Sequence, residues 1–78
     1  MGRLENQVML ILEWFGGQGA TSHDVYFGTS FPLPFLGNQT ANYFQGGALE
    51  PGRTYYWRID EVNSFGTRPG WTWRFTVD

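Results

Sequence analysis

The sequence contains no cysteine, no lysine and a single histidine, His23. The missing cysteines exclude a disulfide-framework toxin or growth factor, and they leave no cluster of ligands for a structural metal. Five arginines stand against seven acidic residues, so the net charge is −2 and no basic footprint for nucleic acid or anionic lipid is present. We therefore expect no metal, no cofactor and no nucleic-acid partner.

Long hydrophobic stretches are also missing. The longest apolar run, residues 8–12, is far shorter than the roughly 20 residues that span a bilayer, and it lacks the features of a signal peptide. A chain of 78 residues forms one small domain, which buries only roughly 60 % of the surface that its unfolded chain exposes. We therefore expect residues 1–78 to be a single domain without a membrane partner. Its core must come from seven Phe, four Tyr and four Trp residues.

Glycine and proline are frequent, and they argue against helices. Eleven glycines and four prolines interrupt the chain, and no stretch between them keeps the apolar spacing of a helix. Several stretches alternate apolar and polar residues instead, with the period of two that is typical of half-buried strands. The clearest are residues 55–59, YYWRI, and residues 73–77, WRFTV. The predicted core residues of these strands are Leu12, Trp14, Val25, Phe27, Leu49, Tyr55, Trp57, Ile59, Trp73 and Phe75.

Turn-forming residues separate these strands at short and fairly regular intervals. This spacing is typical of antiparallel sheets whose inner faces bury each other. The sequence therefore predicts an all-β fold, a two-sheet antiparallel β-sandwich of about six to seven short strands.

Three segments resemble fibronectin type III domains. Leu12-Glu13-Trp14 is similar to the tryptophan signature of that family's second strand, residues 49–55 (LEPGRTY) resemble its loop into the sixth strand, and residues 57–63 its continuation. Residues 19–30 and 54–63 are similar to modules of this family in large multidomain extracellular bacterial proteins. The resemblance covers residues 12–77 and implies an Ig-like fold, an extracellular location and a spacer or accessory role.

The resemblance also implies a tyrosine corner. In such a corner the hydroxyl of Tyr55 bonds back to the loop near Leu49 or Pro51 and fixes the path of the chain. The family normally begins with a strand well before the Leu-x-Trp strand, whereas only residues 1–7 come before residues 8–14 here. The first strand is therefore expected to be shortened or missing. The Met1-Gly2 start is compatible with a designed or recombined protein built on such a module, and a natural fragment is the alternative.

A shortened start leaves a predicted surface for self-association. If Leu12 and Trp14 face inward, Met9 and Ile11 face outward, and Tyr43 joins them if Phe44 is the inward residue of its own strand. Apolar residues beside an unpaired strand edge favour pairing with another chain, so we expect a homo-oligomer through this N-terminal strand edge. The alternative is that residues 1–7 fold back as a short first strand and cover the edge.

Catalytic groups are not arranged for chemistry in this sequence. Ser22 and Asp24 adjoin His23, but neighbouring residues in a strand point to opposite faces, so they cannot form a triad with it. His23 is better explained as a histidine at the edge of the core. Asp60 and Glu61 diverge for the same reason, and a pair of carboxylates that acts on one bond must converge. We therefore expect no enzymatic activity.

Two other surfaces could bind a partner. The outer face of the 54–63 strand carries Tyr56, Arg58 and Asp60, which are expected to form a solvated ladder of ion pairs and Arg–ring contacts. In the topology that the resemblance implies, the loops 15–22, 37–41 and 63–70 gather at one end of the domain. The aromatic and arginine residues that they present are Phe15, Phe65, Arg68 and Trp71.

The sequence thus supports a noncatalytic accessory or scaffold module that self-associates through an open sheet edge. The second hypothesis is a domain that binds protein or carbohydrate with the loop tip of Phe15, Phe65, Arg68 and Trp71.

Overall fold

The computed structural model describes residues 8–15 and 19–77, with the side chains of Val8 and Met9 outside that description. The strands are β1 (Val8–Glu13), β2 (Ser22–Gly28), β3 (Phe35–Gln39), β4 (Tyr43–Leu49), β5 (Thr54–Asn63), β6 (Gly66–Arg68) and β7 (Thr72–Thr76). Within these residues no helix has the length and apolar character needed to cross a membrane. The prediction of an all-β protein with antiparallel sheets is confirmed.

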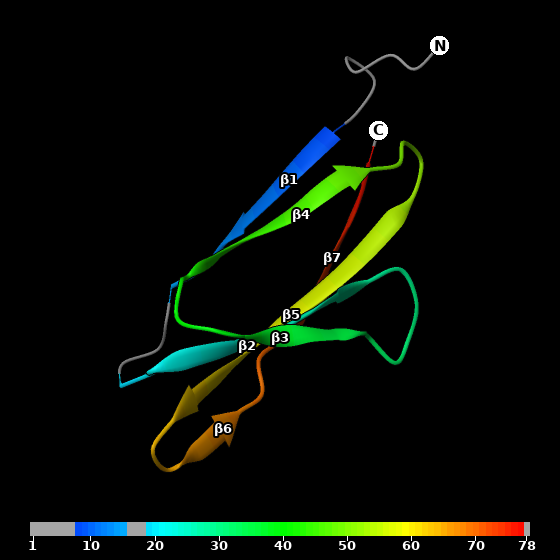
Figure 1. Ribbon diagram of the computed structural model, residues 1–78. Helices are drawn as coiled ribbons and strands as arrows, with labels where there is room; N and C mark the ends of the chain where they lie inside the picture. The colour runs from blue at the N-terminus through cyan, green and yellow to red at the C-terminus, as the bar shows by residue number, and fades with distance from the viewer. Residues whose placement is uncertain (1–7, 16–18, 78) are drawn as a thin grey trace.

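The seven strands form one sheet of two strands and one of five (Figure 1). β1 pairs with β4 in the smaller sheet. In the larger sheet β5 is central: β2 pairs along one side of it and carries β3 on its far edge, while β7 and β6 share the other side. β7 pairs with the first half of β5 and β6 with its last three residues.

The break between β6 and β7 has a local cause. Pro69 has no N–H to donate to the ladder. At Gly70 a Cβ atom would lie 2.1 Å from the carbonyl oxygen of Ile59, so only glycine allows the backbone to approach β5 this closely. Two short strands therefore flank β5 where one long strand could have formed.

The core lies between the two sheets and centres on Tyr55. Its ring stacks between those of Phe27 and Phe75, at centroid distances of 5.4 and 5.7 Å. Leu49 and Val77 are buried in the same cluster. Phe27 also contacts Phe44 of β4, so the aromatic contacts run from one sheet to the other.

Most of the predicted core is at least half-buried. Leu12, Val25, Leu49, Tyr55 and Ile59 are buried, and Trp14, Phe27, Trp57 and Phe75 are partly buried. Val77, which was expected on the inner side of the last strand, is buried as well. The prediction for Trp73 is wrong, because this side chain is 57 % exposed.

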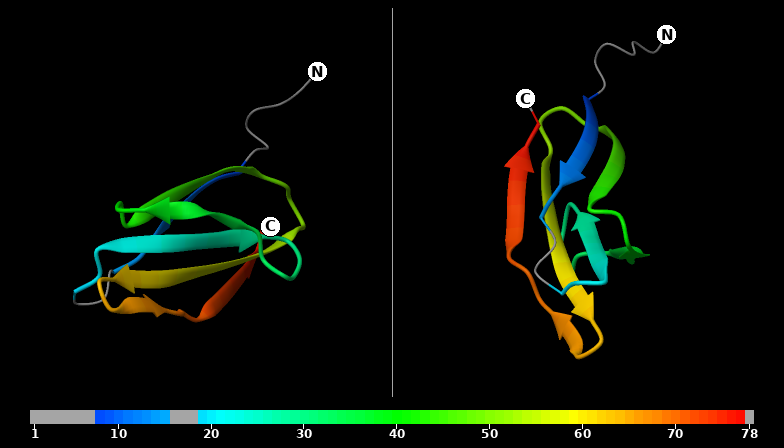
Figure 2. Two further views of the ribbon diagram at one scale, coloured as in Figure 1. Left: turned by 60° about the horizontal axis from the view of Figure 1, so that its bottom comes forward. Right: turned by 90° about the vertical axis from the view of Figure 1, so that its left-hand side faces the viewer.

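Trp73 is exposed because the smaller sheet is too narrow to cover it. It pairs with Trp57, which in turn pairs with Phe27, so all three side chains lie on the inner face of the larger sheet. In the right-hand view of Figure 2, β1 and β4 lie side by side, β5 is seen next to β1, and β7 lies beyond β5 with no described strand of the smaller sheet alongside. Trp73 therefore lies on the inner face of the larger sheet without being buried.

The bond expected from Tyr55 is present. The backbone N–H of Glu50 donates to the Tyr55 hydroxyl at 2.9 Å, which ties the loop before β5 to the core. Gly52 lies in the same turn with φ +81, and its N–H donates to the carbonyl of Val77 at 2.7 Å. The tyrosine thus joins the end of β4 to the start of β5.

Tyr55→Phe tests this bond. The change keeps the stacked ring but leaves the N–H of Glu50 without its acceptor, which should lower the free energy of unfolding by about 1–3 kcal/mol. Urea denaturation followed by tryptophan fluorescence measures the loss. Tyr56→Phe, on the outer face of the same strand, is the control and should change stability by less than about 0.5 kcal/mol. Equal effects of the two changes would contradict the role of the Tyr55 hydroxyl.

Candidate functional site

The outer face of the β1–β4 sheet carries exposed apolar side chains. Ile11 is 58 % exposed and Tyr43 is 51 % exposed. Ile11 pairs with Gln45 and Glu13 with Tyr43, so Ile11 and Tyr43 are diagonal neighbours on one face. Met9 belongs to the same strand, opposite Ala48, but its side chain lies outside the described residues. The structure therefore brings together two of the three residues predicted for self-association.

A bulge in β4 preserves this arrangement. The register shifts between Leu10 and Ile11, where the partner changes from Gly47 to Gln45 and Gly46 becomes the extra residue. A Cβ at Gly46 would meet the Leu10 side chain at 2.7 Å, and Gly47 has φ +79. Glycine at both positions lets Leu10 pack inward while Ile11 remains on the outer face.

The predicted loop tip is only partly assembled. His23 pairs with Gln39 and Ser22 with Val62, so the loops that follow β1, β3 and β5 gather at one end of the domain. Phe65 is 97 % exposed, and it lines a shallow hollow of about 210 Å³ together with Arg68.

Phe15 lies at the same end of the domain but in a different hollow, and Trp71 lies away from this end. Phe15 lines a separate hollow of about 380 Å³, with Glu13, Trp14 and Asn42. Trp71 precedes Thr72, which pairs with Arg58, so Trp71 lies beside the middle of β5 and not at the tip. The structure therefore joins Phe65 and Arg68 but spreads the four residues over three places.

The outer face of the larger sheet carries a charged network. The Arg58 guanidinium lies 4.1 Å from the ring centroid of Tyr26, which confirms the expected Arg–ring contact. Its Nε and one terminal nitrogen donate to the two carboxylate oxygens of Asp60 at 2.8 and 3.1 Å. These bonds raise the pKa of Arg58 above its ordinary value. The guanidinium is thus held in one orientation over the sheet.

Asp60 differs from the expected solvated ladder, because it is only 4 % exposed. The segment between β6 and β7 passes beside it, and the N–H of Gly70 donates to its carboxylate at 2.9 Å. A buried carboxylate is tolerated when it is paired and hydrogen-bonded, as it is here. Asp60 therefore holds the segment between β6 and β7 against β5.

Asp60→Ala should lower the free energy of unfolding by about 2–3 kcal/mol, because it removes the acceptor of both Arg58 and the Gly70 N–H. Chemical denaturation at neutral pH measures the change. Asp24→Ala is the matched control: Asp24 lies opposite Asp60 on β2 and accepts a bond from the exposed Asn38. Its loss should cost less than about 1 kcal/mol. A larger loss at Asp24 than at Asp60 would show that the network does not anchor the edge.

His23 is buried, as expected of a histidine at the edge of the core. Its ring lies edge-on to Trp14 at 5.5 Å, and its Nδ1 lies 2.8 Å from a carboxylate oxygen of Glu61. Glu61 is 38 positions away in the sequence, and it was not recognised as the partner of His23. The pairing of His23 with Glu61 across β2 and β5 brings them together.

The residues next to His23 in the sequence do not converge on its ring. The Ser22 hydroxyl accepts a bond from Asn38 on the opposite face of β2, so it does not reach the imidazole. In the part of the chain that the structure describes, no three His, Asp or Glu side chains lie together as they would around a metal ion. The His23–Glu61 pair therefore orients a ring in the core.

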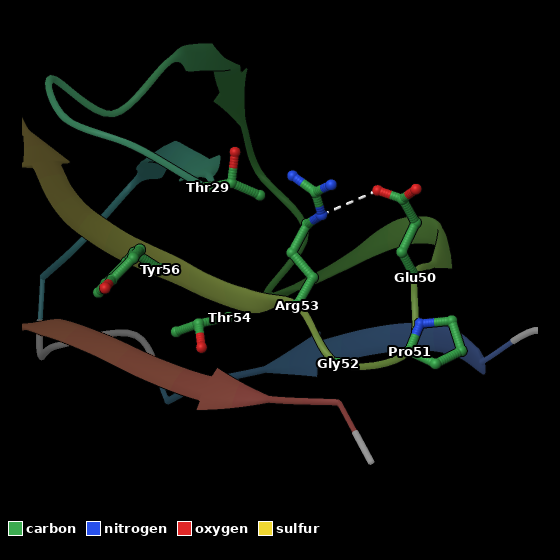
Figure 3. Close-up of a pocket in the computed structure, with 7 residues that line it drawn as sticks. All are labelled: Thr29, Glu50, Pro51, Gly52, Arg53, Thr54 and Tyr56. Carbon is green, nitrogen blue, oxygen red and sulfur yellow. Dashed lines mark ion pairs between the residues drawn. The ribbon is translucent and has the colours of Figure 1, made fainter.

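Figure 3 shows a third hollow, at the turn between β4 and β5. It has a volume of about 420 Å³ and is lined by Thr29, Glu50, Pro51, Gly52, Arg53, Thr54 and Tyr56. Arg53 donates to Glu50 at 2.9 Å, and both side chains are at least half-exposed. Surface ion pairs of this kind contribute little energy, and the hollow is open to solvent. Its two charged side chains pair with each other, and none of its lining residues is buried.

Comparison with protein-family models, with curated proteins and with solved structures gave no match. The geometry therefore defines the class of protein by itself: a small all-β protein built from two antiparallel sheets.

Proposed function

We propose that the chain is a noncatalytic accessory or scaffold module with a fibronectin type III-like sandwich, and that it self-associates through the β1–β4 sheet. The division of strands supports this family. If β1 is the second strand of such a module, its pairing with β4, and the grouping of β2, β5 and β7, follow the two-sheet division of Ig-like folds. The bond from Glu50 to Tyr55 agrees with the family's tyrosine corner.

The contacts of the titratable groups support a noncatalytic role. His23 is held by Glu61 and Trp14, and Asp60 is held by Arg58 and the Gly70 N–H. A general acid or base must reach the proton of a bound substrate. These groups are engaged inside the fold, where their contacts stabilise the strands.

The observation that carries the self-association proposal is the outer face of the smaller sheet, which has two strands among the described residues. Ile11 and Tyr43 lie on it, more than half-exposed, beside a strand edge without a described partner. Exposed apolar residues that gather on one face typically mark an interaction site, and a sheet edge strengthens that tendency. A second copy could bury these side chains against its own Ile11 and Tyr43 about a two-fold axis.

Sedimentation of the purified chain over a concentration series tests the proposal. We expect a dimer at high micromolar concentration, and we expect Ile11→Thr with Tyr43→Thr to shift it to monomer, since threonine keeps the strand but removes apolar area. Leu36→Thr is the control, because Leu36 is exposed on β3 of the other sheet and should leave association unchanged. A wild-type monomer throughout the series would contradict self-association.

The loop tip supports a second candidate, binding of protein or carbohydrate. Phe65 projects from the β5–β6 hairpin next to Arg68, a pairing of residue types common at interfaces. Under this alternative, Phe65→Ala abolishes binding on a glycan array and leaves the melting temperature within about 2 °C, since the side chain packs against little. Trp71→Ala, away from the tip, is the comparison. An array without signal for the wild-type protein counts against the carbohydrate form.

A further inference from the structure

The hollow of Figure 3 is built on a turn that the rest of the domain holds in place. The N–H of Val77 donates to the carbonyl of Arg53 at 3.0 Å, and the N–H of Gly52 donates to the carbonyl of Val77 at 2.7 Å. At the other end of the turn, the N–H of Glu50 donates to the hydroxyl of the buried Tyr55 at 2.9 Å. Both ends of the turn are therefore fixed, which lowers the ordering cost of binding a ligand there.

The turn presents a hydrogen-bond donor and an acceptor side by side. The Nε of Arg53 donates to Oε1 of Glu50 at 2.9 Å (Figure 3). The two side chains keep 50 % and 69 % of their surface exposed. A guanidinium carries about five N–H donors and a carboxylate accepts about four bonds, so both groups retain capacity beyond this contact. The pair can therefore receive hydroxyl groups that donate to Glu50 and accept from Arg53.

The rest of the lining adds hydroxyl groups and an aromatic wall. Thr29 and Thr54 line the hollow, and the Thr54 hydroxyl lies 2.7 Å from that of Thr76 in a hydrogen bond. The half-buried side chain of Tyr56 lines the same hollow. The Phe31 ring packs on the Tyr56 ring at 4.9 Å and stays 62 % exposed, so it extends the aromatic surface beyond the hollow. The hollow therefore combines a polar side with an apolar one.

The charges of the lining select against an ionic ligand. Glu50 and Arg53 are the charged residues that line the hollow, and their formal charges cancel. Glu50 repels an anion that approaches Arg53, and Arg53 repels a cation that approaches Glu50. A neutral ligand with hydroxyl groups meets neither repulsion. Each of its hydroxyls both donates and accepts, which matches an acceptor and a donor that lie side by side.

We propose that this place, which we call the turn hollow and which is lined by residues 29, 50–54 and 56, binds a neutral sugar in its ring form. A pyranose has hydroxyl groups around its edge and C–H groups on its face, so it matches both sides of the hollow. Neighbouring hydroxyls of the sugar bond to Glu50 and Arg53, and its C–H face packs against Tyr56. The volume of about 420 Å³ lies within the range of ligand sites, roughly 300–1,000 Å³.

The turn hollow is separate from the surfaces of the proposed function. Arg53 precedes the first residue of β5, whereas Phe65 of the loop tip follows the last residue of this ten-residue strand. Thr54 and Tyr56 lie on the outer face of the larger sheet, since the alternate residue Tyr55 is in the core. Ile11 and Tyr43 lie on the smaller sheet. A sugar in the turn hollow therefore contacts neither surface.

The test is a titration of the isotope-labelled chain, followed by amide chemical shifts, with methyl glucoside, methyl galactoside and methyl mannoside. These three neutral probes differ in the orientation of their hydroxyls. A single sugar ring in a shallow hollow should bind with a dissociation constant in the millimolar range, so at least one probe should give saturable shifts at residues 29, 53, 54 and 56 by about 100 mM.

The uronic acid and amino-sugar forms of the best probe test the role of charge. The first carries a carboxylate and the second an ammonium group. Both should bind at least roughly threefold more weakly than the neutral sugar, because each meets a like charge in the Glu50–Arg53 pair.

Two substitutions locate the bound sugar. Arg53→Met keeps the length of a half-exposed side chain and removes its donors, so it should weaken binding by roughly tenfold and leave the fold intact. Tyr56→Leu keeps an apolar side chain but removes the ring, and it should weaken binding to a similar extent. Arg68→Met is the matched control: it removes an arginine from the loop tip and should leave binding unchanged.

Three results would overturn the proposal. The first is the absence of saturable shifts with all three neutral probes at about 100 mM. The second is binding of the charged forms as tight as that of the neutral sugar. The third is binding that Arg53→Met leaves unchanged; if Arg68→Met abolishes it instead, the sugar is bound at the loop tip. None of these results bears on sedimentation of the chain, so this proposal and self-association fail or succeed separately.

Discussion

The fold depends on the burial of one ring, that of Tyr55. A chain of 78 residues without cysteine must hold two sheets together through side chains alone. The Tyr55 ring packs between Phe27 and Phe75, and its hydroxyl accepts the Glu50 N–H at the end of β4. One side chain therefore links β2, β5 and β7 of the larger sheet to Glu50, the residue that follows β4 of the smaller sheet. The remaining core residues extend this contact toward each end of the domain.

The sequence predicted which direction most strand residues face, because alternation is a local property. It predicted burial less well, because burial of a side chain depends on whether the other sheet covers it. Tyr55, Ile59 and Trp73 have the same inward orientation, but only the first two lie beneath the smaller sheet. The width of that sheet follows from pairing between distant segments, which no single stretch of residues reveals.

The polar contacts show the same limit. The contact of Arg58 with Tyr26 could be foreseen, since both lie on outer faces of neighbouring strands. The partner of His23 could not, because Glu61 becomes its neighbour only through the register of β2 and β5. Burial of Asp60 also escaped prediction, since it depends on the close approach of Gly70 to β5. The outer-face pair of Ile11 and Tyr43 was anticipated from alternation, whereas the exposure of Trp73 beside Trp57 required the three-dimensional arrangement.

The break between β6 and β7 limits how the protein can assemble. An unbroken strand on that side of β5 would present a long free edge, and such edges recruit further strands without limit. Here Pro69 and the close approach of Gly70 to β5 divide that strand into β6, with three residues, and β7, with five. The two short strands do not share one continuous edge. The bulge at Gly46 interrupts β4 in the same way. A register shift interrupts β3 as well, so the six-residue β1 has the longest uninterrupted free edge among the described strands. Short or interrupted edges of this kind disfavour the continuous strand pairing on which a fibre depends.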